Sequence, residues 1–315
     1  MDAIVEIRDL SKKYTSLFKK RDVLAVDGVS LEVGKAEILG FLGPNGAGKT
    51  TTIKLTCGLL KPTKGSIYID GLEVEKNRRK VLPKLGAVLE GTRNSHWPLT
   101  IKENLTYFGN LKNLRGRTLR RNIEHILELF DLQEKADVPV KMLSQGMKQK
   151  LAIALALISD PLLLLLDEPT SNLDVKSSRL IKEKVRELAT EEGKAVIITT
   201  HNMEVAQEIC ERVAIINKGK IVALDRVENL IHLFSEQRYE FKVQNNFGWE
   251  ELQKLAFVKE VQYQSNETCN TLTLTFEDTA GLYDVMDILR SKKVIIKSIN
   301  NKKASLEDIF LSLTV

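Results

Sequence analysis

The sequence predicts an α/β fold with a mostly parallel sheet core, followed by a small C-terminal α+β domain. Short apolar runs at residues 37–42, 162–166 and 195–200 have the composition of strands that are buried on both faces. Segments of helical periodicity separate these runs, a pattern typical of a parallel sheet covered by helices. Beyond about residue 226, alternating strand patterns follow one another more closely. We therefore expect domains at residues 1–225 and 235–315, joined by a linker helix at 226–234.

The elements of the first domain follow from local patterns. Residues 4–7 and 24–33 alternate or run apolar, and residues 65–71 form a short run between turn glycines, so each predicts a strand. Between about residues 90 and 160 the pattern becomes helical, with helices expected at 120–132 and 147–157. A further helix is expected at 182–188. The expected helix at 120–132 has one apolar face, which consists of Ile123, Ile126, Leu127 and Phe130.

The second domain begins after a helical segment at residues 227–234. Alternating apolar residues predict strands at 239–243, 258–264, 271–277 and 294–299. Helices are expected at 280–290 and 306–313. The pattern indicates a separate small unit that combines helices with a sheet.

Composition excludes several classes of protein. Of the 315 residues, 43% are hydrophobic and 28% are charged, as in soluble globular proteins. The net charge is only +5, and residues 226–315 hold 11 Lys and Arg against 13 Asp and Glu. This balance argues against a basic nucleic-acid-binding arm, so we expect no nucleic-acid partner.

Membrane-spanning and secreted classes are also disfavoured. The most apolar segment, residues 151–166, is interrupted by Ser159, Asp160 and Pro161 and is shorter than the roughly 20 residues that cross a bilayer. The N-terminal residues lack the pattern of a signal peptide. The 3 cysteines are widely separated, which suggests neither a disulfide framework nor a zinc site and favours a reducing cytosol.

A phosphate-binding loop is the most specific motif in the chain. It matches the pattern G-x-x-x-x-G-K-[ST] and lies between the expected strand at 37–42 and a helix that begins near residue 50. Its glycines let backbone N–H groups surround phosphate oxygens at a helix N-terminus, where anions are favoured. This context disfavours the alternative of a glycine-rich turn without a ligand. The loop consists of Gly43, Pro44, Asn45, Gly46, Ala47, Gly48, Lys49, Thr50 and Thr51.

Side chains at two places would complete a nucleotide site. Lys49 would place its charge on the terminal phosphates, and the Thr50 hydroxyl would bind Mg²⁺. The apolar strand at 162–166 ends at Asp167 and Glu168. Asp167 could bind the same Mg²⁺, and Glu168 could polarise the attacking water. An ordinary buried strand with a solvated acidic turn is the alternative, and the phosphate loop disfavours it.

Further motifs resemble the ATP-binding cassette (ABC) family of transporter ATPases. Residues 143–147, Leu-Ser-Gln-Gly-Met, resemble the LSGGQ signature of that family, and residues 167–174 resemble its Walker B motif and D-loop. His201 follows a strand, as the switch histidine of the family does. The resemblance covers about residues 3–225. It implies a P-loop NTPase ABC cassette with a parallel sheet core, an antiparallel β region and a helical subdomain at about 90–160.

The resemblance implies a role for each motif, with ATP and Mg²⁺ as the bound groups. Tyr14 would stack on the adenine, or else pack on the core as a strand-edge tyrosine. Ser144 and Gly146 would contact the γ-phosphate of ATP bound to a facing subunit, while Ser144 also suits the N-cap of the next helix. Asp174 would bridge the dimer. His201 would contact the γ-phosphate, unless it is a satisfied core histidine.

Two motifs depart from the family pattern. Gln145 and Met147 replace the usual glycine and glutamine of the signature, although its two phosphate-contacting residues are retained. Glu90 stands where the family usually has the Q-loop glutamine. A carboxylate can still bind Mg²⁺, but charges about 6 Å apart repel by roughly 3 kcal/mol at an effective dielectric near 20. We hypothesise that repulsion between Glu90 and Glu168 alters the metal or pH dependence of turnover.

Residues 90–100 resemble the daunorubicin-type drug and peptide exporter branch of the family, and so does the tail at 305–310. In ABC proteins this stretch faces the membrane subunit, so Arg93, Trp97 and Pro98 are candidate docking residues, with a purely structural loop as the alternative. The resemblance implies a permease on a separate chain and a second ATP-binding subunit. It also implies a cytoplasmic protein that is peripheral on the inner face of the cell membrane.

The function implied is an ATPase that powers transport, with export favoured. Glu168, His201, Lys49 and Glu90 would form its catalytic group. A soluble ABC ATPase that acts on ribosomes or DNA is the alternative, but such proteins resemble tandem cassettes or carry long coiled-coil insertions, and this chain has neither. A small-molecule kinase with the same loop is disfavoured by the signature motif.

Overall fold

The computed structural model describes residues 3–15, 22–90, 94–233, 237–244, 248–265, 270–276, 280–301 and 305–314. It divides into two compact units, Met1–Val227 and Glu228–Leu313. Each unit has a sheet and a hydrophobic core of its own.

A six-stranded sheet lies at the centre of the first unit, in the order β10-β9-β3-β8-β7-β6 over the residues described. The strands from β9 to β6 are parallel to their neighbours, and β10 is antiparallel to β9. Every residue of β3, β7 and β8 is buried, which explains their nearly continuous apolar sequence. The strands are β3 (Ile38–Leu42), β6 (Leu85–Val88), β7 (Leu163–Asp167), β8 (Ala195–Thr200), β9 (Arg212–Asn217) and β10 (Lys220–Arg226).

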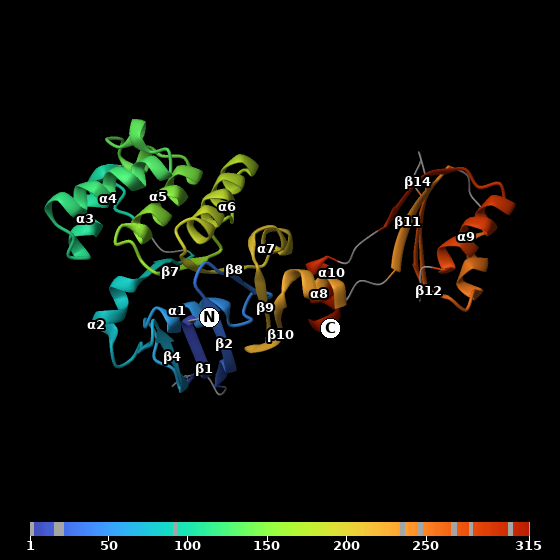
Figure 1. Cartoon of the computed structure of the whole chain (residues 1–315), viewed down its shortest axis with the longest axis horizontal. Helices are drawn as coiled ribbons and strands as arrows, with labels where there is room; N and C mark the ends of the chain where they lie inside the picture. The colour runs from blue at the N-terminus through green and yellow to red at the C-terminus, as the bar shows by residue number, and fades with distance from the viewer. Residues whose placement is uncertain are drawn as a thin grey trace. The chain divides into compact units, whose positions relative to one another are not determined.

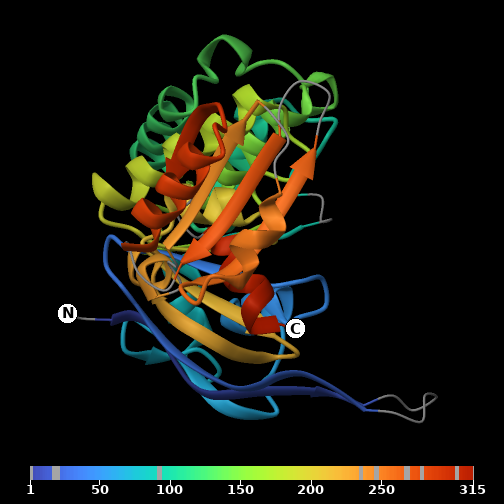
Figure 2. The same ribbon diagram turned by 90° about the vertical axis from the view of Figure 1, so that its right-hand side faces the viewer.

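A separate antiparallel sheet has the order β2-β1-β4-β5. Its main part is a long ribbon of β1 (Ala3–Tyr14) and β2 (Val23–Gly34), which pair from Ala3 with Gly34 to Tyr14 with Val23 through several bulges (Figure 2, dark blue). The smaller strands are β4 (Lys64–Ile69) and β5 (Leu72–Glu73). Both sheets contribute to one core, because Val5 of β1 and Phe41 of β3 belong to the same buried cluster as Ile53.

The helices α3, α4 and α5 lie together as a helical subdomain (Figure 1). α3 packs on α4 and α5, and α5 also packs on β6 and α6. These contacts place the helical subdomain against the central sheet. The helices of the first unit are α1 (Lys49–Thr56), α2 (Arg78–Val81), α3 (Ile101–Leu111), α4 (Gly116–Leu129), α5 (Gln145–Leu157), α6 (Val175–Thr190) and α7 (Met203–Ile209), with short 3-10 helices η1 (Leu82–Lys84), η2 (Gln133–Lys135) and η3 (Val140–Met142).

Two predicted helices have different bounds in the structure. The helix expected at 120–132 begins earlier and ends at Leu129, and Asp131 follows with a positive φ of 53° that an α-helix does not accommodate. The helix expected at 182–188 is the longer α6, whose first turn is capped by Asp174. Strands β9 and β10 and helix α7 lie in a stretch for which no element was predicted.

The second unit contains a four-stranded antiparallel sheet, with α9 on one face (Figure 1). Its order over the described residues is β12-β13-β11-β14. Phe241, Leu272, Leu274 and Phe276 of the sheet share a core with Val285 of α9. The elements are α8 (Val227–Leu233), β11 (Gln237–Val243), η4 (Trp249–Lys254), β12 (Val258–Ser265), β13 (Asn270–Phe276), α9 (Ala280–Ser291), β14 (Ile296–Asn301) and α10 (Leu306–Thr314).

No helix within the described ranges combines the length and the apolar composition that a membrane span requires.

Candidate nucleotide site

The phosphate loop connects β3 to α1, and close backbone packing explains two of its glycines. A Cβ on Gly43 would lie 2.3 Å from the carbonyl oxygen of Ile216. A Cβ on Gly48 would lie 2.4 Å from the carbonyl oxygen of Ala25, and Gly48 also has a φ of 110°. Neither position can hold a side chain without moving the backbone. The neighbouring strands therefore set the path of the loop.

A cavity of about 130 Å³ lies over this loop. Glu90 and Glu168 line it together with Ala25, so three segments far apart in sequence meet at the loop. A Cβ on Gly46 would meet nothing within 4 Å, which shows open space at that part of the loop. The loop residues that line the cavity are Pro44, Asn45, Gly46, Ala47, Gly48, Lys49, Thr50 and Thr51.

Lys49 is buried within the loop. Its Nζ donates to the carbonyl oxygens of Gly43 at 2.6 Å and Pro44 at 3.2 Å. Burial lowers the pKa of Lys49, and the carboxylates of Glu168, Asp167 and Glu90 act in the opposite direction. The ammonium group is therefore held among backbone oxygens, at the position from which it could reach a phosphate.

Asp167, at the C-terminal end of β7, has one satisfied and one unsatisfied carboxylate oxygen. Its Oδ1 accepts hydrogen bonds from the hydroxyls of Thr50, at 3.2 Å, and Thr199. Its Oδ2 is buried and has no hydrogen-bond partner among the residues that the structure describes. A buried carboxylate oxygen without a partner is costly unless a cation binds it. This oxygen, beside the Thr50 hydroxyl, fits the oxygen ligands that Mg²⁺ requires.

Glu168 has a strained backbone, and each of its two carboxylate oxygens has a hydrogen-bonding partner. Its φ is 50°, in the left-handed region that is uncommon for residues other than glycine. Ser171 donates to Oε2 at 3.0 Å, and Nδ1 of His201 lies 2.8 Å from Oε1. The side chain is almost buried, at 7% exposed, whereas His201 is 58% exposed. The strained turn thus holds the carboxylate at the cavity.

The signature and D-loop residues form a second group. Ser144 caps α5 by accepting from the backbone N–H of Met147 at 3.3 Å. Asp174 caps α6 by accepting from the backbone N–H and the hydroxyl of Ser177, at 2.9 and 2.7 Å, and these bonds lower the pKa of Asp174. A Cβ on Gly146 would lie 2.3 Å from the Ser177 hydroxyl oxygen, so the N-terminal turns of α5 and α6 pack closely.

The structure brings some of the predicted site residues together and leaves others apart. The loop, Glu90 and Glu168 share a cavity, and Asp167 and His201 bond to residues of that cavity. Ser144, Gly146 and Asp174 do not line it. The predicted site residues therefore fall into two separate groups.

Tyr14 also lies outside the residues that line this cavity. It ends β1 opposite Val23 and is 41% exposed. The Nζ of Lys12 lies 5.5 Å from the centre of its ring. The ring is therefore not fully buried as a strand-edge tyrosine packed on the core would be, and Lys12 lies over one of its faces.

The candidate docking loop is held by a buried residue that sequence reasoning missed. Asn104 of α3 accepts from the backbone N–H of His96 at 2.7 Å and donates to carbonyl oxygens of the loop, including that of His96 at 3.0 Å. Trp97 is 42% exposed, with the Nζ of Lys148 5.0 Å from its ring. Pro98 is exposed. Arg93 lies outside the described residues.

Ser171 and Thr199 were also missed. Ser171 lies inside the motif at 167–174, and a hydroxyl three residues after Glu168 was a signal that could have been used. Thr199 could not be found in this way, because only the pairing of β8 with β7 brings it to Asp167.

The fold and the loop define a P-loop nucleotide-binding protein, and comparison with known proteins gives its family. The ABC transporter family description matches residues 26–171. The C-terminal domain of DrrA1-3-like ATP-binding proteins matches residues 226–314.

Three similar proteins are named as ATP-binding proteins of transport or export. The ABC transporter ATP-binding protein NatA of Bacillus subtilis is 37% identical over 227 residues, which are 72% of this chain and 91% of NatA. The uncharacterized ABC transporter ATP-binding protein YhcH of the same species is 30% identical over 314 residues, 100% of this chain and 97% of that one. A Nod factor export ATP-binding protein I of Ralstonia nicotianae is 36% identical over 228 residues, 72% of this chain and 68% of that one.

Two solved structures that are similar to this chain are also ABC transporter subunits or ATP-binding cassettes. The ATP-binding subunit of an ABC transporter aligns with a TM-score of 0.65 at 27% identity, over 73% of this chain and 93% of that one. A dimeric ATP-binding cassette in a post-hydrolysis state, bound to ADP and Pi, aligns with a TM-score of 0.64 at 28% identity, over 70% of this chain and 98% of that one.

The chain belongs to the ABC transporter family of ATP-binding proteins. It is an ATP-binding subunit of an ABC transporter and an ATPase. The family resemblance drawn from the motifs is therefore confirmed.

Proposed function

We propose that this subunit powers export through a separate membrane permease, and that ATP drives closure of a dimer of cassettes. One observation carries the proposal. Ser144 and Gly146 do not line the cavity that contains Lys49 and Glu168, so a facing cassette would have to supply the signature residues. The dimeric state of the similar cassette bound to ADP and Pi supports this arrangement.

In the proposed site, the residues of the loop hold the triphosphate. Backbone N–H groups of residues 43–51 and the Lys49 ammonium would bind the β- and γ-phosphates. Thr50, Asp167 and Glu90 would hold Mg²⁺, which neutralises charge on the phosphates when bound. Tyr14 would stack on the adenine.

Glu168 would act as the general base for water attack. Its position fits this role, because it lines the cavity and lies beside the Mg²⁺-binding carboxylate. His201, which contacts Glu168 at 2.8 Å, would orient that carboxylate and contact the γ-phosphate. Hydrolysis would remove the contact with the γ-phosphate and so allow the dimer to open.

The signature group would act on the ATP of the partner. Ser144 caps α5 with its side chain, and the exposed N–H groups of that helix end favour an anion. Asp174 packs close to Gly146 and would join the two subunits. Both groups would then complete sites that neither chain forms alone.

The permease would dock on the loop at residues 90–100, with Trp97 and Pro98 as contact residues. The subunit would then lie in the cytoplasm, peripheral on the inner face of the membrane. The direction of transport is inferred from the relatives named for Nod factor export and from the resemblance of residues 90–100 and 305–310 to the exporter branch.

The C-terminal domain, residues 235–315, is proposed to stabilise or regulate the dimer, with 226–234 as the linker helix. Removal of residues 235–315 should weaken ATP-dependent dimerisation in sedimentation experiments. An unchanged dimer would show that this domain has another role.

Co-purification tests the whole proposal. The tagged subunit, expressed with its native membrane proteins and extracted in detergent, should retain a membrane protein with several spans. Trp97→Ala should lose it, whereas Tyr283→Ala, a substitution of an exposed aromatic residue in the second unit, should retain it. Recovery of ribosomes or DNA in place of a membrane protein would instead support the soluble ATPase.

A further inference from the structure

A second cavity in the first unit lies away from the phosphate loop. Its volume is about 350 Å³, and none of the residues that line it lines the nucleotide cavity. Small-molecule sites commonly begin at about 300 Å³, so this space suits a small ligand. The cavity is formed by α4, by the C-terminal ends of α5 and α6, and by the turn that leads into β8.

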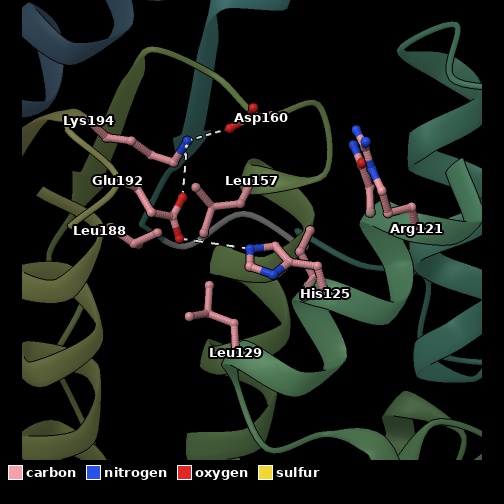
Figure 3. Close-up of a pocket in the computed structure, with 10 residues that line it drawn as sticks. Arg121, His125, Leu129, Leu157, Asp160, Leu188, Glu192 and Lys194 are labelled. Carbon is pink, nitrogen blue, oxygen red and sulfur yellow. Dashed lines mark hydrogen bonds and ion pairs between the residues drawn. The ribbon is translucent and has the colours of Figure 1, made fainter. Parts of the chain in front are cut away.

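One wall of this cavity carries an ion-pair network of one lysine and two carboxylates. Lys194 is 7% exposed, and its Nζ donates to Oδ1 of Asp160 at 2.5 Å and to the carbonyl oxygen of Pro161 at 3.2 Å. Oε2 of Glu192 lies 3.3 Å from the same Nζ (Figure 3). Because two carboxylates share one ammonium group, this wall has no free positive charge to offer.

The wall formed by α4 carries an arginine and a histidine instead of carboxylates. Arg121 and His125 are four residues apart and therefore lie on the same side of the helix. Nε2 of His125 lies 3.9 Å from Oε1 of Glu192, while Arg121 has no hydrogen bond or ion pair within the described part of the chain (Figure 3). The Arg121 guanidinium is thus a charged donor at the cavity that lacks a partner.

The remaining lining is apolar. Leu129 lies one turn beyond His125 on the same side of α4, and it lines the cavity together with Leu157 of α5 and Leu188 of α6. Both Leu157 and Leu188 are at most 5% exposed. Leu129 is more exposed than these two leucines, so an apolar body would mainly cover Leu129, and removing apolar surface from water is favourable.

We propose that this cavity binds a small amphipathic monocarboxylate. Its carboxylate would pair with Arg121, whose guanidinium matches that group in a bidentate geometry. Its apolar body would lie against Leu129, Leu157 and Leu188. A second carboxylate on the ligand is disfavoured because, once Arg121 is paired, Asp160 and Glu192 outnumber Lys194, and an amine would be repelled by Arg121.

Because the cavity lies between α4, α5 and α6, a bound ligand would contact all three helices. Asn122 of α4 already donates to the carbonyl oxygen of Ile158 at 2.9 Å, which ties α4 to the end of α5. A ligand would join α6 to this pair. The opposite ends of α5 and α6 are capped by Ser144 and Asp174. An effect on ATP hydrolysis would rest on the proposed function, whereas binding itself does not.

Calorimetric titration of the full chain with octanoate tests the proposal. Octanoate should release heat and raise the melting temperature, because a ligand of the native state stabilises it. Octanol, octylamine and suberate, the dicarboxylate of similar length, should bind at least tenfold more weakly. The proposal is overturned if octanoate does not bind, or if any of the other three binds equally well.

Two variants locate the site. Arg121→Gln should weaken octanoate binding at least tenfold, while Arg117→Gln, another exposed arginine of α4 that does not line the cavity, should bind as the native chain does. Leu129→Trp should fill the cavity and also abolish binding. Equal affinity of Arg121→Gln and Arg117→Gln would show that octanoate binds elsewhere.

Discussion

Nδ1 of His201 lies 2.8 Å from Oε1 of Glu168. The two residues follow the ends of β8 and β7, which are adjacent parallel strands, so sheet pairing alone brings them together. The hydroxyl of Ser171 donates a hydrogen bond to the other carboxylate oxygen of Glu168 at 3.0 Å. The proposed general base is thus held on both sides before any substrate binds.

Glu168→Gln should still bind ATP and remain dimeric with it, but hydrolyse ATP poorly. An amide keeps the shape of the side chain and cannot accept the proton of the attacking water, a loss of about 10²–10⁴-fold. Phosphate release and light scattering with ATP would measure both effects. Glu183→Gln, a surface change on α6, is the control. Rapid turnover by Glu168→Gln would exclude the role of general base.

His201→Ala should lower kcat by about 10²-fold, the scale of a single lost transition-state hydrogen bond. The affinity for ATP should change less than kcat does, because the loop residues and Lys49 would supply most of the contacts with the phosphates. Steady-state kinetics and nucleotide titration separate the two quantities. His232→Ala, at an exposed position of α8, should have no effect on either. A change confined to ATP affinity would contradict the positioning role.

Glu90→Gln should change the Mg²⁺ concentration that half-maximal turnover requires. The substitution removes a negative charge from a cavity that also contains Glu168, and it leaves an amide oxygen that can still bind the metal. ATPase rates across a Mg²⁺ series and a pH series would measure the change. If both profiles match those of the native chain, the proposed repulsion is not significant.

Gly48→Ala should destabilise the fold more than Gly46→Ala does. Both glycines have positive φ, but only at Gly48 would the new Cβ meet backbone, at 2.4 Å from the carbonyl oxygen of Ala25. Backbone strain costs about 1–3 kcal/mol in each variant, and the clash adds to it at Gly48. Urea unfolding of the two variants gives the difference directly. Equal loss would show that the loop adjusts freely.

Lys49→Met should raise the stability of the nucleotide-free protein at neutral pH and abolish its stabilisation by ATP. Burial lowers the pKa of Lys49, so the cost of keeping it charged is fully present below that lowered pKa. The free-energy cost of the charged group decreases as pH rises from this lowered pKa towards the ordinary pKa of lysine. The stability advantage of Lys49→Met should decrease over the same alkaline pH range. Denaturant unfolding at several pH values, with Lys54→Met as the control, would show this. A constant difference at every pH would contradict the assigned cause.

Sequence patterns located the nucleotide loop and the strands because the signals are local. Glycines at fixed spacing, an apolar run that ends at Asp167 and Glu168, and the strand at Ala195–Thr200 each depend on neighbouring residues only. Helix ends were less accurate where a cap or a positive φ decided them, as at Asp174 and Asp131. The resemblance of the motifs added the family, which local patterns could not provide.

The sequence by itself determined the phosphate loop, the carboxylates and the family, since these depend on residue types at short spacing. Only the tertiary structure decided that Thr199 and Thr50 share one oxygen of Asp167 and that its other oxygen is buried without a partner in the described part of the chain. It also decided that Gly146 packs on Ser177, apart from the loop cavity. Such contacts join residues on different strands and helices, and the order of strands in the sheet sets them.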